Sequence, residues 1–223
     1  MDIQELAALL RQNGVVGAGG AGFPTYAKLD ARAQTIILNC AECEPLLKLH
    51  RQLLEFHADE IVAAFSLIRE TLGAADAVIG IKRAYKKTIA ALEGVLPRYQ
   101  GIRLKLLDEV YPAGDEVVLI YEVTGKVVRP GGLPIECGVC VFNVETCYNL
   151  SRAGTGTMLK RAAASCCQCT MCTDLCPRYL LGHPIQPHLF MRAATCKDIQ
   201  DPGIFIDTLF CSSCGLCELY SCF

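Results

Sequence analysis

Short apolar runs alternate with amphipathic segments along most of the chain. A short apolar run bounded by turn residues is typical of a buried strand, whereas apolar positions three and four apart are typical of a helix. These patterns predict strands at residues 35–39, 77–81 and 102–107, and helices at residues 2–12, 45–71, 85–96 and 143–152. Because strands alternate with helices, the pattern favours an α/β fold with a mainly parallel sheet covered by helices.

Two segments are less regular. Residues 117–123 fit a strand by their β-branched content and a helix by their flanks, Gly114-Asp-Glu116 and Gly125. Gly154-Thr-Gly-Thr157 is a low-complexity patch, after which cysteine becomes frequent. We therefore predict three parts, which are a first domain at residues 1–153, a linker at 154–157 and a small second domain at 158–223.

Charge and hydropathy exclude two classes of partner. Twenty-one basic and 23 acidic residues give a net charge of -2, which is too close to neutral for a protein that binds a phosphate backbone. The longest apolar run, residues 61–68, is far shorter than the roughly 20 residues that span a bilayer. The N-terminus has no basic segment followed by an apolar stretch, so we expect a cytoplasmic protein with no membrane span.

Ten of the 15 cysteines lie at residues 166–222, and in a reducing compartment such clusters bind metal rather than form disulfides. The run Cys166-x2-Cys169-x2-Cys172-x3-Cys176-Pro177 has the spacing of bacterial ferredoxins, in which the fourth cysteine binds the other of two clusters. A second run contains Cys211, Cys214, Cys217 and, one residue later than the usual spacing, Cys222.

Eight thiolates in two such runs predict a ferredoxin-like domain with two [4Fe–4S] clusters. By the crossed arrangement, Cys222 would complete the cluster of the first run and Cys176 that of the second. A zinc site is the alternative, but zinc takes two pairs of ligands rather than two triplets, each with a distant fourth. Cys167, Cys147 and Cys196 receive no role.

Other cysteines and histidines favour structural interpretations. The pairs Cys40/Cys43 and Cys137/Cys140 could form a zinc site together, but buried thiols with no ligand role are the better interpretation. His183 and His188 flank a Pro-containing turn after the first cluster run, where a lone histidine is more often structural than a ligand.

A glycine-rich loop precedes the first strand. Gly17-x-Gly19-x-x-Gly22 satisfies the dinucleotide fingerprint, yet that motif needs a strand before it and a helix opening at its last glycine. Here a helix precedes the loop and Phe23-Pro24 follows it. The loop still lets backbone N–H groups approach a phosphate or a flavin ring, so a nucleotide-type ligand is the leading hypothesis and a tight loop without a ligand is the alternative.

Several motifs resemble known families. The chain is similar to the flavin- and NADH-binding subunit of respiratory complex I in residues 17–25 with Lys28, in residues 39–45, and in Asn143-Val-Glu-Thr146. It looks closer still to the cobalamin reductases of propanediol-utilisation microcompartments, which are relatives of the RnfC protein of Rnf complexes. That likeness lies in residues 111–116, 121–125, 130–134 and 174–183, and in the late cysteine Cys222.

The resemblance implies an FMN site with NADH stacked above the flavin. Its residues would be Gly17, Gly19, Gly20, Gly22, Phe23, Lys28, Asn39, Glu42, Glu44 and Asn143, with Asp115 and Glu116 closing the pocket. In the complex I pattern an asparagine precedes Asn143, whereas this chain has Phe142. No side chain is expected to act as an acid or a base.

The resemblance also implies parts that this chain lacks. Family members carry a ubiquitin-like SLBB domain between the flavin domain and the clusters, and further sequence after the second cluster. Here Ser151-Arg-Ala153 leads directly through residues 154–157 to the cluster domain. We therefore expect a shortened chain in which residues 154–157 are an engineered join.

The expected function is that of an NADH-dependent oxidoreductase. Electrons would pass from NADH through FMN and two [4Fe–4S] clusters to an acceptor, which the family likeness makes a corrinoid. Three alternatives stay open, namely a subunit of an Rnf-type membrane complex, a ferredoxin-like carrier without flavin, and a folded but inactive chain. The preference for NADH over NADPH, the number of associated chains and a location inside a bacterial microcompartment are not readable from these residues.

Overall fold

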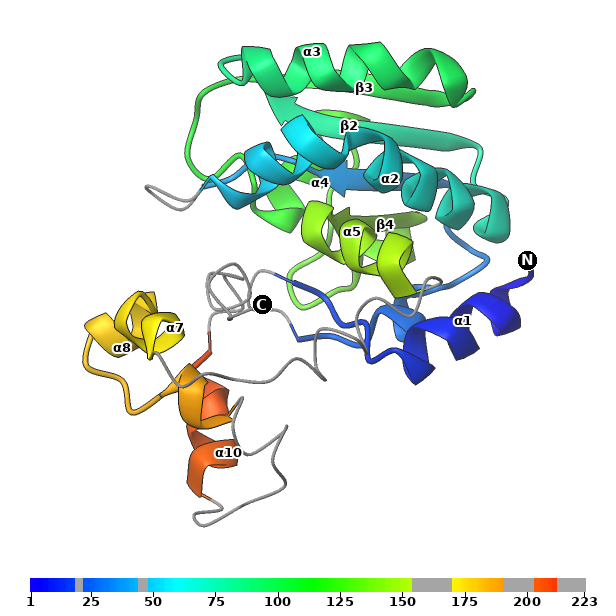
Figure 1. The fold of residues 1–223 in the computed structure, drawn as a ribbon. Coiled ribbons are helices and arrows are strands. Elements are labelled where there is room, and N and C mark those ends of the chain that lie inside the picture. Colours follow the sequence, from blue (N-terminus) through cyan, green and yellow to red (C-terminus); the bar gives the residue numbers. More distant parts are fainter. Residues whose placement is uncertain (19–21, 44–47, 154–169, 191–202, 212–223) are drawn as a thin grey trace. The chain divides into compact units, whose positions relative to one another are not determined.

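The computed structural model describes residues 1–18, 22–43, 48–153, 170–190 and 203–211 (Figure 1). The chain folds as two units, of which the larger comprises Met1–Gly17 and Phe23–Gly154 and the smaller Ala18–Gly22 and Thr155–Phe223. The linker predicted at residues 154–157 lies outside the described residues. Each unit is described by itself below.

The larger unit is built on a four-stranded parallel sheet with the order β3-β2-β1-β4. Its strands are β1 (Thr35–Asn39), β2 (Asp76–Lys82), β3 (Ile102–Leu107) and β4 (Val139–Asn143). The first three confirm the strands expected from the apolar runs, and the parallel sheet confirms the α/β class. The strand β4 was not predicted.

In the part of the larger unit that the structure describes, five α-helices and three short 3-10 helices surround this sheet. The α-helices are α1 (Ile3–Gln12), α2 (Leu49–Leu72), α3 (Lys86–Val95), α4 (Glu116–Thr124) and α5 (Val144–Ala153). The 3-10 helices are η1 (Thr25–Lys28), η2 (Leu96–Arg98) and η3 (Pro134–Cys137). The segment that fitted either a strand or a helix is therefore a helix, α4.

Capping residues explain where these helices begin and end. Asp2 and Glu5 form a reciprocal capping box at the start of α1. Asp115 accepts hydrogen bonds from two N–H groups of the first turn of α4, and Gly125, with φ of 71°, ends that helix in the left-handed region. Gly73 ends α2 in the same way, with φ of 65°.

The helices cover both faces of the sheet. On one face α2 packs between α3 and α5 (Figure 1). On the other face α4 contacts β2 and β4. Because successive residues of a strand point to opposite faces, Ile37 meets α4 while its neighbours Ile36 and Leu38 face the α2 layer. This two-sided burial is the reason that β1 is a continuous apolar run.

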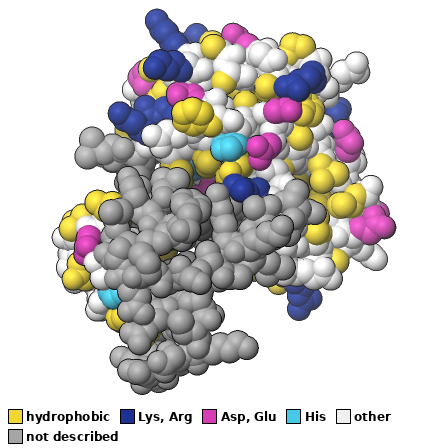
Figure 2. Space-filling model, viewed as in Figure 1, with side chains coloured by type: hydrophobic (Ala, Val, Ile, Leu, Met, Phe, Trp, Pro, Cys, Tyr) yellow, Lys and Arg dark blue, Asp and Glu magenta, His cyan; other side chains and the backbone are white. Residues whose placement is uncertain are grey.

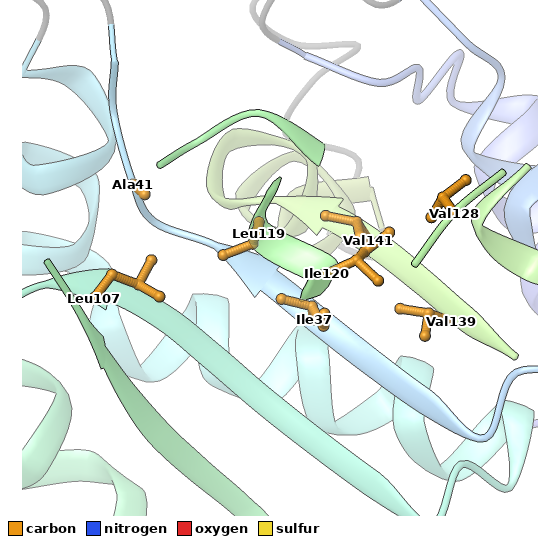
Figure 3. Packing of buried hydrophobic residues seen from close by; sticks show 8 residues of the cluster. All are labelled: Ile37, Ala41, Leu107, Leu119, Ile120, Val128, Val139 and Val141. Atoms are coloured by element: carbon orange, nitrogen blue, oxygen red, sulfur yellow. The ribbon is translucent and has the colours of Figure 1, made fainter. Parts of the chain in front are cut away.

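Under α4 lies a compact apolar cluster (Figure 3). Leu119 and Ile120 of α4 are fully buried there against Ile37 of β1 and against Val139 and Val141 of the edge strand β4. A Cβ at Gly80 of β2 would lie 2.8 Å from Leu119 Cδ1. The glycine in the middle of β2 therefore lets α4 approach the sheet closely.

The described part of the smaller unit is helical. It contains α7 (Met171–Asp174), α8 (Pro177–Leu180), α10 (Gly203–Asp207) and η4 (Thr208–Phe210). No helix among the described residues is long and apolar enough to cross a membrane. On the face of the molecule shown in Figure 2, acidic and basic side chains are interspersed over the described residues.

The packing of α4 gives a stability prediction. Replacing Leu119→Ala removes a fully buried side chain from the sheet face, so we expect a loss of about 3 kcal/mol in the free energy of unfolding of the larger unit. Val117→Ala in the same helix is the matched control, because Val117 is 45% exposed. Urea denaturation of both variants measures the difference, and equal losses would contradict the assigned orientation of α4.

Candidate functional site

The order in which successive strands are added to the sheet changes direction between β1 and β4. The chain runs from β1 outward to β2 and β3, and then returns past β1 to form β4. In open parallel sheets, ligands bind at the carboxyl ends of the strands where the order reverses in this way. Asn39 and Asn143 are the last residues of β1 and β4 and are register partners. Two residues of the expected FMN site therefore lie together at the switch point.

The loop after β1 crosses the segment before α4 at Gly114. Asn39 Nδ2 donates to the Gly114 carbonyl at 2.8 Å, and the Gly114 N–H donates to Cys43 Sγ at 2.9 Å. A Cβ at Gly114 would lie only 1.9 Å from the carbonyl oxygen of Ala41. Only glycine fits this crossing, because any side chain would displace one of the two backbones.

Lys28 brings a positive charge to the carboxyl half of β4. Its Nζ donates to the Val141 carbonyl at 3.1 Å and lies 3.5 Å from Glu116 Oε1. The same ammonium group is 6.0 Å from the ring centroid of Phe23. The structure thus brings together three predicted site residues from two separate segments, Phe23 and Lys28 from one and Glu116 from the other. The Lys28 side chain is 28% exposed, so it stays accessible to solvent and ligands.

Asp115 and Asn143 both use their side chains to cap helices. Asp115 Oδ1 accepts the N–H groups of Val117 and Val118 at the start of α4. Asn143 Oδ1 accepts the N–H group of Glu145 at 2.8 Å in the first turn of α5. Each residue therefore sits at a helix N-terminus on the carboxyl side of the sheet. Helix N-termini carry partial positive charge.

The carboxylate of Glu42 is held by the protein itself. Oε1 accepts the backbone N–H of His50 and Oε2 accepts Nε of Arg51, each at 2.9 Å. The Glu42 carbonyl accepts Lys82 Nζ at 2.9 Å and the Tyr85 hydroxyl at 3.2 Å. Burial lowers the pKa of the His50 imidazole, which favours the neutral ring, although the nearby Glu42 carboxylate acts in the opposite direction. The Glu42 carboxylate is therefore turned toward α2.

The glycine-rich loop begins and ends as a small hairpin. The Gly17 N–H donates to the Phe23 carbonyl at 2.7 Å, and Val16 forms an isolated antiparallel bridge with Pro24. Gly22 has φ of 56°, a left-handed conformation that favours glycine. Three of the residues predicted to bind FMN lie outside the described residues, namely Gly19, Gly20 and Glu44.

Three of the eight predicted cluster ligands lie among the described residues. Cys172 and Cys176 are buried and Cys211 is exposed. Cys176 precedes Pro177, the first residue of α8, as the ferredoxin run requires. The other five lie outside the described residues, namely Cys166, Cys169, Cys214, Cys217 and Cys222.

Other cysteines and histidines have local partners or are buried. Cys40 is 1% exposed, and burial raises the pKa of the Cys140 thiol to about 11. No group of three His, Cys, Asp or Glu side chains within metal-binding reach occurs among the described residues. His188 Nδ1 lies 2.7 Å from Thr173 Oγ1, and the His183 ring stacks on Phe210. These contacts fit the structural roles expected for both histidines.

Sequence reasoning missed the residues that hold the loop after β1 in place. Arg51, Lys82 and Tyr85 all contact Glu42, and Gly114 with Cys43 forms the loop crossing. Gly114 lies in a motif that carried the family resemblance, but only the structure shows its close contact. Arg51 and Tyr85 had no local signal, because their partner is distant in the sequence.

Comparison with known proteins places the chain in a family. Residues 10–152 match the Nuo51 FMN-binding domain, and residues 165–223 match a 4Fe-4S dicluster domain. The cobalamin reductase PduS of Citrobacter freundii is 32% identical over 99% of this chain and 68% of its own length. The chain belongs to the PduS family. It is an electron-transfer oxidoreductase that combines an FMN-binding domain with a 4Fe-4S domain.

Other curated proteins and a solved structure are also similar to this PduS family member. The PduS protein of Salmonella typhimurium is 32% identical over all of this chain and 68% of its own length. One subunit of the proton-translocating ferredoxin:NAD(+) oxidoreductase complex of Clostridium ljungdahlii is 37% identical over 69% of this chain and 34% of its own length. A crystal structure of H2-reduced NAD+-reducing [NiFe]-hydrogenase matches 74% of this chain and 33% of its own, at 27% identity and a TM-score of 0.64.

The alignment with the Citrobacter PduS extends over 310 positions, whereas this chain has 223 residues. It therefore includes many positions at which this PduS family member has no residue. The two matched family regions are separated in this chain by residues 153–164.

The crossing at Gly114 gives the second prediction. Gly114→Ala forces the Ala41 backbone away, so we expect a loss of about 3 kcal/mol in the free energy of unfolding together with weaker FMN binding. Gly94→Ala in α3 is the matched control, because a Cβ there meets nothing within 4 Å, and it should stabilise the helix by about 1 kcal/mol. Denaturation and flavin fluorescence measure both effects. Identical behaviour of the two variants would contradict the crossing.

Proposed function

We propose that this chain transfers electrons from NADH through FMN and two [4Fe–4S] clusters to a corrinoid. The observation that carries the proposal is the presence of an FMN-binding domain and a dicluster domain in a single chain. The eight cysteines in two ferredoxin-type runs support a count of two clusters. The name of the two PduS relatives, cobalamin reductase, supports cobalamin as the acceptor.

The number of electrons that NADH and the clusters exchange explains why FMN is needed between them. NADH releases two electrons together as a hydride, whereas an iron–sulfur cluster accepts one electron. FMN, when bound, supplies the chemistry that converts a two-electron donor into single-electron transfers. The chain itself has to position this group, exclude other reactions and place the cluster ligands. No acid or base among the side chains is needed for these tasks.

The residues at the switch point fit a flavin mononucleotide. Asn39 and Asn143 lie at adjacent strand ends, and Lys28 offers a partly exposed positive charge. We assign the FMN site to Gly17, Phe23, Lys28, Asn39 and Asn143, together with residues 42–43. The family resemblance adds Gly19, Gly20, Gly22 and Glu44, and the glycines would let backbone N–H groups approach a ligand closely.

Acidic residues of the predicted site divide into two groups. Glu42 and Asp115 are bonded to the starts of α2 and α4, so we assign them to the support of the site. Glu116 pairs with Lys28 at a partly exposed position, so we assign it to the pocket rim near the nicotinamide of NADH. The role of Glu44 rests on the family resemblance alone.

Membership of an ion-translocating membrane complex is the second candidate. It is favoured by the 37% identity to the clostridial protein. That likeness covers 69% of the chain, whereas the PduS proteins align with nearly all of it, which favours cobalamin reduction. Cobalamin reduction by the isolated protein separates the two candidates.

The proposal also places the protein in the cytoplasm or inside a microcompartment, which cell fractionation tests. It includes association into homo-oligomers, which light scattering tests.

An anaerobic absorbance titration with NADH tests the relay. Protein reconstituted with FMN, iron and sulfide should show bleaching of both the flavin band and the broad cluster absorption, followed by recovery when cob(III)alamin is added. NADPH at the same concentration is the control for donor identity. Loaded protein whose two absorption bands do not respond to NADH would rule out the relay.

The crossed cluster arrangement is tested by Cys176→Ser. Because Cys176 would complete the cluster bound by Cys211, Cys214 and Cys217, we expect this variant to lose that cluster and to keep about half of its iron. Cys167→Ser is the matched control and should keep all of its iron, because no ligand role is assigned to it. Iron analysis and electron paramagnetic resonance measure the result. Full iron in the Cys176 variant contradicts the assignment.

A further inference from the structure

The Glu42 carboxylate occupies the start of α2. Its side chain is 5% exposed, and Oε1 accepts the N–H of His50 in the first turn of the helix. The N-cap residue, Lys48, makes no side-chain cap hydrogen bond. Glu42 therefore supplies from a distance the acceptor that a local cap would otherwise provide. A buried carboxylate needs such partners, because its desolvation is costly.

Arg51 supplies the charge that balances this carboxylate. Its Nε donates to Glu42 Oε2 at 2.9 Å, and its guanidinium lies 4.5 Å from the ring centroid of Tyr85. Stacking on an aromatic ring fixes the plane of a guanidinium, which a lysine ammonium cannot reproduce. Arg51 thus joins α2 to the segment between β2 and α3.

The backbone of Glu42 is fixed from the same side. Lys82 Nζ and the Tyr85 hydroxyl both donate to its carbonyl, at 2.9 Å and 3.2 Å. Tyr85 therefore contacts both the Glu42 backbone and the arginine that holds the Glu42 carboxylate. The position of Glu42 is therefore determined by contacts with α2, with β2 and with the segment before α3.

This position determines the path of the loop after β1. Glu42 follows Ala41, whose carbonyl lies at the crossing with Gly114, and it lies three residues after Asn39 at the strand end. A shift of Glu42 would therefore change the backbone that passes the switch point. A displacement of about 1 Å in positioning residues is enough to cost a large factor in ligand binding or rate.

We propose that Arg51 is a positioning residue of the flavin site, which acts through Glu42 and Tyr85 to hold residues 39–43 in the geometry that binds FMN. The inference rests on the proposed function. Arg51 touches no ligand in this proposal, and its effect on FMN is transmitted by the loop. Arg51→Met should raise the dissociation constant of FMN about tenfold, and Arg51→Lys, which keeps the charge without the stacking, about threefold.

The experiment measures FMN binding by flavin fluorescence quenching of the full chain with its clusters. Arg103→Met is the matched control, because Arg103 also pairs with a carboxylate, that of Asp76 at 2.8 Å, near the amino ends of β2 and β3. This control should bind FMN within twofold of the unchanged protein. A tenfold effect at Arg51 only, with similar thermal unfolding of both variants, supports a positioning role.

A double-variant cycle tests the route of the effect. If Arg51 acts through Glu42, then Arg51→Met should weaken FMN binding by less than twofold in a Glu42→Gln background. Full additivity of the two changes would overturn this route. Tyr85→Phe, which removes only the hydroxyl that donates to Glu42, is a milder variant and should weaken binding two- to threefold even if Arg51→Met fails to fold.

The outcomes distinguish the two levels of the proposal. If the protein without substitutions binds no FMN, both the proposed function and this inference are overturned. If it binds FMN, and the dissociation constants of Arg51→Met and Tyr85→Phe lie within twofold of its own, the inference alone is overturned.

Discussion

The crossing of two backbones at Gly114 is the constraint on which the rest of the larger unit depends. There the loop after β1 passes so close to the approach to α4 that a Cβ would lie 1.9 Å from a carbonyl oxygen. Asn39 and Cys43 bond to the carbonyl and N–H groups of the same glycine. The crossing therefore fixes where α4 begins, and with it the place of Glu116 beside Lys28.

Charged side chains at this edge of the sheet hold the scaffold in place. The Glu42 carboxylate is almost fully buried and is balanced by Arg51 and a helix N-terminus, while Asp115 caps α4. A buried charge with such partners is costly to move, so it holds its loop in one position. Lys28 is more exposed than the Glu42 carboxylate, which suits a group that contacts a ligand.

Local signals in the sequence predicted most of the fold. Apolar runs identified three strands, whereas residues 117–123 fitted either a strand or a helix, and the flanks that fitted a helix, Asp115 and Gly125, are the caps of α4. The strand β4 (Val139–Asn143) was not predicted, although its residues are also apolar. The supporting contacts could not be predicted, because pairs such as Lys28 and Val141 are 113 residues apart. The proposed cluster ligands, in contrast, are close in sequence, so spacing alone was enough to predict them.

The departure of the glycine loop from the dinucleotide fingerprint has a physical reason in this fold. In that fingerprint the ligand's phosphate binds at the N-terminus of the helix that follows the first strand. Here the helix after β1 is α2, and the Glu42 carboxylate already accepts an N–H group of its first turn. A phosphate at that position would meet a buried negative charge. A glycine loop that serves a phosphate therefore has to approach from another segment, and in this chain it precedes β1.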